Sequence, residues 1–328
     1  MLKIATQLLI FALLLLKAPF IRAQDPHFSG KDDMNIWYNP AIKTNKFPVT
    51  HVSMRSVKYP NIISYSSKVA TIELPIVSRG ITDYDNVFFM NLAAGISTDN
   101  SSDHFMNAST AMLALSYAMP LNNDNTYLAL GLQGNYSFNR VGTAYAYNLP
   151  AGFDKYGALG SAMTIDPFGS GFNFGYFTAG AGVSVFHSGI RKQWYFGGSI
   201  RHFNHPYTEF SYSARLPSNN GIQAGYTTPI NNANDISGYA NFTWQAGTNE
   251  QNMSEQFMGV RYSHHLNDST NNALSFGLGL RAGDALIPGA AIDIGVSRVA
   301  FYYEINISGM PSGNYHRKAL EFSFRLNL

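Results

Sequence analysis

Along most of the chain, apolar and polar residues alternate with a period of two. In the segment 273–281, Leu274, Phe276 and Leu278 fall on one face, while Ser275 and Gly277 fall on the other. Side chains two positions apart on a β-strand point the same way, so this pattern predicts a strand. The same alternation occurs in segments 89–97, 126–136, 177–185, 239–247, 299–308 and 320–328.

These segments have the length and the two faces of membrane-spanning strands. About ten residues cross an outer membrane at a tilt. The less apolar face carries Gly, Ser, Thr, Asn and Gln, not the Lys and Glu that coat the solvent face of a β-sandwich. Within hydrocarbon every backbone N–H and C=O must be paired, so such a sheet must close. We therefore expect an all-β fold, a transmembrane antiparallel β-barrel of about 14 strands with a polar lumen.

Composition agrees with a chain that has much of its surface in lipid. Of its 328 residues only 13% are charged, about half the usual share, while 14% are aromatic. This balance excludes a disordered chain, and the absence of cysteine excludes a disulfide scaffold or a thiolate metal site. Aromatic residues near strand ends, at Trp194, Tyr195, Tyr226 and 301–303, predict interfacial belts. The Gly-, Ala- and Pro-rich region 140–172 predicts a long loop.

The first residues have the pattern of a cleavable secretory signal. Lys3 precedes an apolar run over residues 4–16, and a short polar stretch ends at Ala23, where we expect cleavage. A retained anchor helix is the less favoured alternative, because Lys17 and Pro19 end the run early. We therefore expect a signal peptide at 1–23, an N-terminal periplasmic or lumen segment at 24–47, and an outer-membrane barrel at 48–328.

Removal of this signal changes the charge balance. The whole chain has 22 basic and 20 acidic residues, and the signal contains Lys3, Lys17 and Arg22 but no acidic residue. The remaining chain thus has 22 − 3 = 19 basic and 20 acidic residues, so its formal charge changes from +2 to −1. It also has no basic run, and nucleic acid is not expected as a partner.

A search for catalytic chemistry finds no supporting pattern. The sequence has no metalloprotease, nucleophile-elbow or phosphate-loop motif, and the glycines at 180 and 182 lie inside an alternating strand. His264 and His265 would point to opposite faces, while His202 and His205 flank a turn, so surface histidines are favoured over a metal site. We assign no catalytic, cofactor-binding or metal-binding residue, and an outer-membrane lipase is a minor alternative.

Several charged residues lie within the strand patterns. A charge on the lipid face costs about 2–4 kcal/mol at the midplane, so these side chains must face the lumen or a rim. They form either a structural ladder, which we favour, or the lining of a site that holds a partner. The residues concerned are Arg261, Arg281, Asp293, Glu304 and Arg325.

Three regions, taken in order, resemble one family of membrane proteins. The first is the run QDPHFS at 24–29 followed by YNPA at 38–41. The second is WYFGGSIRHFNHP at 194–206, and the third is RAGDALIP at 281–288 with YEINIS at 303–308 and EFSF at 321–324. This ordered set resembles the PorP/SprF family of Bacteroidota. The chain departs from the family pattern at residues 30–34 and 54–60 and in its last residue.

The resemblance implies an outer-membrane barrel of the type IX secretion and gliding machinery. Its implied role is to bind the gliding-type C-terminal domain of a secreted adhesin and anchor it at the cell surface, with periplasmic type IX components and outer-membrane lipid as further partners. A channel or transporter for small solutes is the alternative. Candidate partner-binding residues in the N-terminal segment or the lumen are Asp25, His27, Phe28, Trp37, Tyr38, Arg261, Arg281 and Glu304.

Overall fold

The structure is a computed structural model. It describes residues 28–42, 47–59, 63–78, 88–102, 106–121, 125–141, 153–154, 157–158, 172–189, 191–207, 215–245, 253–267, 272–308 and 317–328. The expected signal peptide at 1–23 lies outside these residues, as do Asp25 and His27.

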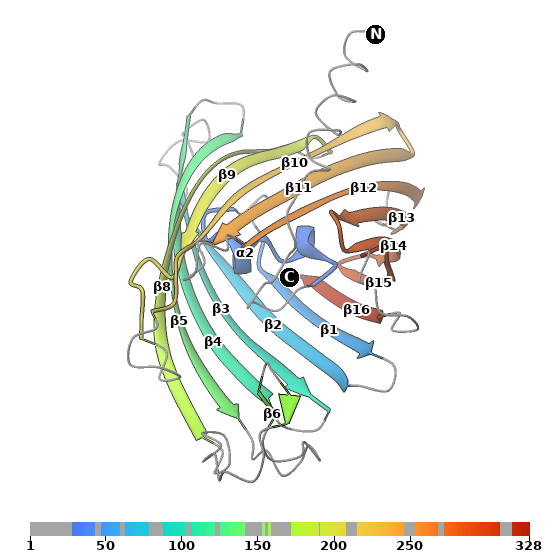
Figure 1. Ribbon diagram of the computed structural model, residues 1–328. Helices are drawn as coiled ribbons and strands as arrows, with labels where there is room; N and C mark the ends of the chain where they lie inside the picture. The colour runs from blue at the N-terminus through green and yellow to red at the C-terminus, as the bar shows by residue number, and fades with distance from the viewer. Residues whose placement is uncertain are drawn as a thin grey trace, which may run out of the picture.

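Fourteen of the described strands form a closed antiparallel barrel (Figure 1), as the alternating segments predicted. Each strand pairs with its neighbours in sequence order, and the first pairs with the last. The strands are β1 (Val49–Tyr59), β2 (Ile63–Ser78), β3 (Phe88–Ser101), β4 (Met106–Pro120), β5 (Thr126–Val141), β8 (Phe172–Ser188), β9 (Gln193–Arg201), β10 (Asn219–Asn231), β11 (Asn234–Gln245), β12 (Met253–Asn267), β13 (Asn272–Arg281), β14 (Ala285–Ile294), β15 (Ser297–Asn306) and β16 (Lys318–Asn327).

The seam between β1 and β16 is fully paired. Its register runs without interruption from Val49 opposite Asn327 to Lys58 opposite Lys318. Closure leaves neither strand as a sheet edge, which is the condition for backbone polar groups at membrane depth.

The two faces of the strands separate as predicted. On β5, Leu130 and Leu132 point outward and are 53% and 63% exposed, while Gln133 and Asn135, which follow them on the opposite face, are buried in the lumen. The expected aromatic belt is only partly correct. Trp194 and Tyr226 are paired opposite each other near one rim, and Tyr226 is exposed, but Tyr195 and Tyr302 face the lumen. For those two the prediction was wrong because residues adjacent in a strand point to opposite faces.

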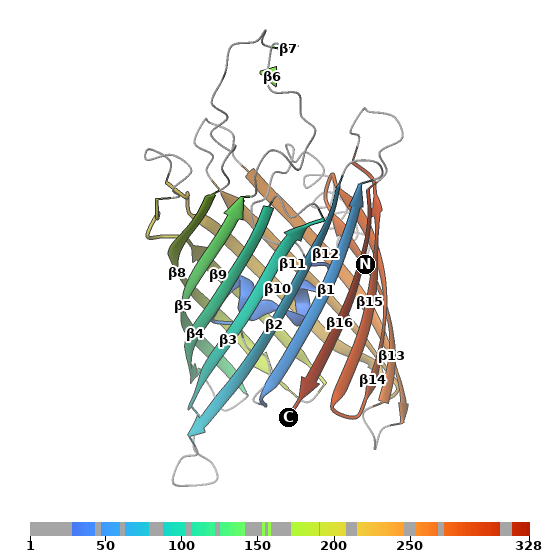
Figure 2. The same cartoon turned by 90° about the horizontal axis from the view of Figure 1, so that it is seen from below.

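The barrel has one end with short turns and one with long connections. The β10–β11 and β14–β15 turns lie at the same end as Val49 and the C-terminus. The ends of β5 and β8 that are joined by 142–171, and those of β9 and β10 that are joined by 202–218, lie at the opposite end (Figure 2). Outer-membrane barrels keep short turns in the periplasm and long loops outside, so the terminal end is periplasmic. Within the expected loop 140–172, the pair β6 (Phe153–Asp154) and β7 (Gly157–Ala158) is described, and most other positions lie outside the described residues.

The lumen contains the chain's own residues 28–42, which we call the plug (Figures 1 and 2). It forms a short 3-10 helix η1 (Lys31–Asp33) and one turn of helix α2 (Asn35–Tyr38). No helix among the described residues is long and apolar enough to cross a membrane. Larger barrels are not filled by their own inward side chains. Here the plug supplies an apolar core against β2, β3 and β4, made of Phe28, Met34, Ile36, Trp37 and Tyr38 with Val69, Ala93, Met112 and Ala114.

The lipid face can be tested with a charge placed at two depths. Leu132 lies mid-strand and Leu121 lies in the β4–β5 turn, and both are more than half exposed. We expect Leu132→Arg to lower the free energy of unfolding by about 2–4 kcal/mol and Leu121→Arg by about 0–1 kcal/mol. Urea titration of the barrel in lipid bilayers measures both values. Equal effects at the two positions would contradict the assigned membrane span.

Candidate functional site

Glu304 on β15 is the centre of a buried ion-pair cluster in the lumen wall. Its carboxylate accepts two hydrogen bonds from Arg55, both 2.9 Å, and two from Arg281, both 3.2 Å. Arg317 lies 3.3 Å away and also pairs with Asp284 in the β13–β14 turn, at 2.8 Å. Forked arginine–carboxylate contacts fix geometry as well as charge. The cluster therefore joins β1, β13 and β15 across the seam region of the barrel.

The start of the plug is bound to this charged wall. The Ser29 hydroxyl donates to Glu304 Oε1 at 2.9 Å. The backbone N–H groups of Ser29 and Gly30 donate to the two carboxylate oxygens of Glu321, at 2.5 and 3.1 Å. Lys31 pairs with Glu255 on β12, and its ammonium lies over the ring of Tyr38 at 5.0 Å. Burial lowers the pKa of Lys31, and the charge of Glu255 opposes that shift.

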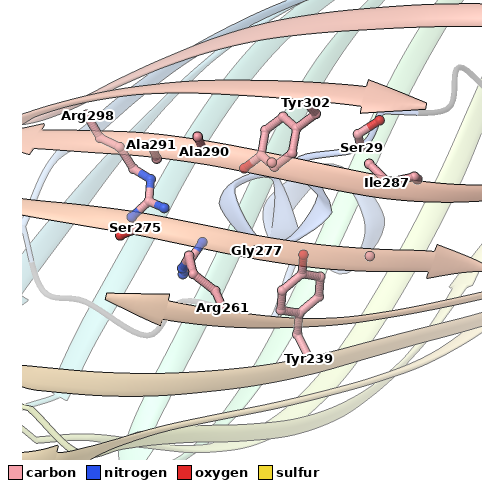
Figure 3. A pocket seen from close by; sticks show the side chains of 12 residues that line it. Ser29, Tyr239, Arg261, Ser275, Gly277, Ile287, Ala290, Ala291, Arg298 and Tyr302 are labelled. Atoms are coloured by element: carbon pink, nitrogen blue, oxygen red, sulfur yellow. The ribbon is translucent and has the colours of Figure 1, made fainter. Parts of the chain in front are cut away.

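Asp33 of η1 is the counter-ion of arginines at the opposite, periplasmic side of the charged wall. It lies 2.5 Å from Arg325 on β16 and 3.6 Å from Arg298 on β15. Burial alone would raise the pKa of this carboxyl, but the guanidinium groups of Arg325 and Arg298 hold it well below its usual range. Figure 3 shows the adjacent small pocket, into which Arg261, Arg298 and the ring of Tyr302 point.

The end of the plug packs against three glycines on the facing wall, Gly131, Gly182 and Gly197, which we call the glycine seat. Asn39 accepts from the Ala41 N–H at 2.9 Å and donates to Gln223 and to the carbonyl of Gly198. The backbone carbonyl of Ala41, also in the plug, accepts a hydrogen bond from the Ser184 hydroxyl at 2.6 Å. A Cβ at any of three wall positions would lie within 3.0 Å of the plug, namely Gly131, Gly182 and Gly197 on β5, β8 and β9. The glycines thus provide the space for the plug backbone.

A polar cavity remains between the plug and the extracellular end, and we call it the polar groove. Its floor is Trp37, and its walls come from β3, β4, β5, β8 and the end of β9. Its lining is mostly neutral amides and hydroxyls, in contrast to the charged wall of β12–β16. The lining residues are Trp37, Ser97, Asp99, Ala108, Thr110, Gln133, Asn135, Ser137, Asn139, Tyr176, Thr178, Arg201 and His202.

The structure places the predicted partner-binding residues in different settings. Arg281 and Glu304 bind each other within the wall, Phe28 and Tyr38 are buried in the plug core, and Trp37 borders the polar groove. Arg261 lies on the pocket of Figure 3. Sequence reasoning missed Glu255 and Glu321, although an acidic residue on the lumen face of a strand is the same signal that identified Glu304.

The described residues provide no obvious metal centre. No group of three or more His or acidic side chains in this part of the chain is close enough to hold a metal ion. His202 and His205 both have positive φ, 58° and 43°, so they shape the turn that follows β9.

The fold and the filled lumen define a plugged outer-membrane β-barrel. The sequence matches the type IX secretion system membrane protein family PorP/SprF over residues 36–326, so the chain belongs to that family. The resemblance read from the three ordered regions is thereby confirmed. No curated protein matches the sequence.

Solved structures with a similar fold are outer-membrane barrels of several kinds. A FadL homologue from Pseudomonas aeruginosa has a TM-score of 0.50 at 10% identity, covering 85% of this chain and 88% of that one. The monoaromatic hydrocarbon channel CymD has a TM-score of 0.48 at 8% identity, covering 94% and 95%. The β domain of the Bordetella autotransporter BrkA has a TM-score of 0.38 at 10% identity, and the match covers 86% of this chain and 99% of that one. At 10% identity, the likeness to the FadL homologue shows the fold alone.

The ion-pair cluster predicts a large effect of removing one charge. Glu304→Gln leaves Arg55 and Arg281 buried without their shared counter-ion, which costs about 3–5 kcal/mol of unfolding free energy. Glu73→Gln on β2 is the matched control, since Glu73 is less buried than Glu304 and accepts a hydrogen bond from Asn91 at 3.4 Å. We expect this control to lower the free energy of unfolding by about 1 kcal/mol. Urea titration in bilayers measures the free energy of unfolding of both variants. If Glu304→Gln lowers it no more than Glu73→Gln does, the central role of Glu304 is refuted.

The glycine seat predicts that one methyl group displaces the plug. A Cβ on Gly131 would lie 2.6 Å from the Pro40 carbonyl carbon, whereas one on Gly238 meets nothing within 4 Å. The chain has no cysteine, so Ala41→Cys introduces a single thiol, at a side chain that is 0% exposed. With Gly131→Ala we expect maleimide to label this thiol at least about tenfold faster than with Gly238→Ala. Equal labelling rates would show that the plug does not depend on this seat.

Proposed function

We propose that this barrel is an accessory of type IX secretion and gliding that binds the C-terminal domain of a secreted adhesin and anchors it at the cell surface. Family membership supports the secretion context. The observation that carries the binding role is the plug, because its charged and backbone contacts fill the middle of the lumen and leave a polar groove on its extracellular side.

The alternative is a channel for small solutes. A diffusion channel needs a continuous path, with binding along it weak enough for the solute to leave. Here the plug crosses the lumen and is fixed on both sides, by Glu321 and Glu255 on one wall and by Ser184 and Gln223 on the other. This arrangement supports a barrel that holds a polypeptide over one that conducts solutes.

The adhesin proposal is tested by purification from native outer membrane. We expect the tagged full chain to recover a large secreted adhesin together with periplasmic type IX components. A variant lacking residues 25–41 is expected to assemble as a barrel, checked by heat-modifiable gel mobility, but to recover much less adhesin. The barrel carrying Gly238→Ala serves as the matched control and should recover the adhesin as the unchanged chain does.

Two results would contradict the proposal. One is recovery of a well-assembled barrel with no secreted polypeptide. The other is steady ion conductance of the unchanged, purified barrel in planar bilayers, which would favour the channel. We expect conductance only after the plug residues are deleted.

A further inference from the structure

The polar groove has the repeat of an extended polypeptide. Gln133, Asn135, Ser137 and Asn139 follow one another on the lumen face of β5, and all four line the groove. Alternate strand residues are about 6.8 Å apart, so this row extends about 20 Å from the plug toward the extracellular end. An extended peptide lying along β5 has the same two-residue repeat. Each step of the row would therefore meet an equivalent backbone group of the peptide.

Two side chains of this row have unused hydrogen-bonding atoms. Within the described part of the chain, Gln133 Oε1 and Asn139 Nδ2 are buried and have no hydrogen-bond partner. Gln133 uses its Nε2 to donate to Asn135 Oδ1 at 3.1 Å. A buried polar atom without a partner costs about 1–3 kcal/mol. The row thus offers one acceptor near the plug and one donor near the outer end, which match the N–H and C=O of a peptide backbone.

The two ends of the groove differ in charge. The strand register places Arg201 beside Gly180, which faces Gln133 at the plug end of the row. It places Asp99 beside Ala108, which faces Asn139 at the outer end. Arginine is the side chain best suited to bind a carboxylate. A peptide with its terminal carboxylate directed inward therefore matches the charge order of the groove.

We infer that the polar groove binds the carboxyl-terminal residues of a secreted polypeptide, extended along β5 with the terminal carboxylate toward Arg201. This inference rests on the proposed function and names the part of the partner that enters the barrel. Main-chain recognition by a row of amides is sequence-tolerant, whereas the rings of Trp37 and Tyr176, which line the same groove, supply the selectivity.

The test uses the purified full-length barrel and a library of random decapeptides with free carboxyl termini. Selected peptides are resynthesised with a free and with an amidated terminus, and fluorescence anisotropy measures their dissociation constants. We expect amidation to weaken binding at least about tenfold in the unchanged barrel. We expect Arg201→Gln to abolish this preference for the free carboxylate while the barrel still assembles.

A matched pair of substitutions tests the amide row. Asn135→Leu removes an amide from the groove, and Asn241→Leu removes a buried amide from β11, outside the groove. We expect the first to weaken peptide binding at least about tenfold and the second to leave it within about twofold. Maltohexaose is the competitor that represents an extended oligosaccharide, and we expect no competition from it.

The outcomes separate this inference from the proposed function. The inference is overturned if amidated and free peptides bind equally, if Asn135→Leu and Asn241→Leu act alike, or if maltohexaose binds in place of the peptides. If adhesin is recovered from native membrane equally by the unchanged barrel and the Asn135→Leu barrel, the proposed function stands and the groove is not its site. If selected peptides bind the groove but no adhesin is recovered, the groove stands and the adhesin proposal fails.

Discussion

The structure depends on the need to fill the interior of a wide barrel. Fourteen strands at the tilt of an outer-membrane protein enclose more space than their inward side chains occupy. The chain meets this need with its own residues 28–42. Since these residues must be held without a continuous apolar lining, the wall supplies charges and amides instead. The buried carboxylates of Glu255, Glu304 and Glu321 in the wall each bind the plug in this way.

The lumen wall is chemically divided. Strands β12, β15 and β16 carry the arginines and carboxylates that bind the first half of the plug, whereas β5, β8 and β9 carry glycines that admit its second half. Buried ion pairs are weak evidence for stability, because desolvation offsets most of the attraction, but they specify one geometry. The division therefore sets the depth and orientation of the plug, and it leaves β3, β4 and β5 above Trp37 without plug contacts, as the polar groove.

Much of the fold was predictable because the membrane enforces a strict period. The alternation of Leu130 and Leu132 with Gln133 is a direct record of lipid on one side and lumen on the other. The sequence pattern predicted glycine only as one of the residues on the less apolar face of the strands, and Gly131, Gly182 and Gly197 do lie on the lumen wall. Their contact with Asn39 and Pro40 joins residues more than 90 positions apart, and no local pattern encodes it. The inward direction of Tyr195 and Tyr302 was missed for a different reason. Tyr195 lies near the start of β9, but closeness to a strand end does not determine the face, and Tyr302 lies in the middle of β15.

The contacts of the plug also order the steps of assembly. Asp33 and Ser29 bind Arg325 and Glu321 on the last strand, at sequence separations of 292 residues. Closing so long a loop is entropically costly, and such contacts form late. The segment near the start of the chain therefore has no complete binding site until the final strand has closed the seam with β1. Docking of the plug thus reports that the barrel is complete, and a truncated or open barrel would leave its apolar Phe28, Met34 and Trp37 exposed to proteases and chaperones.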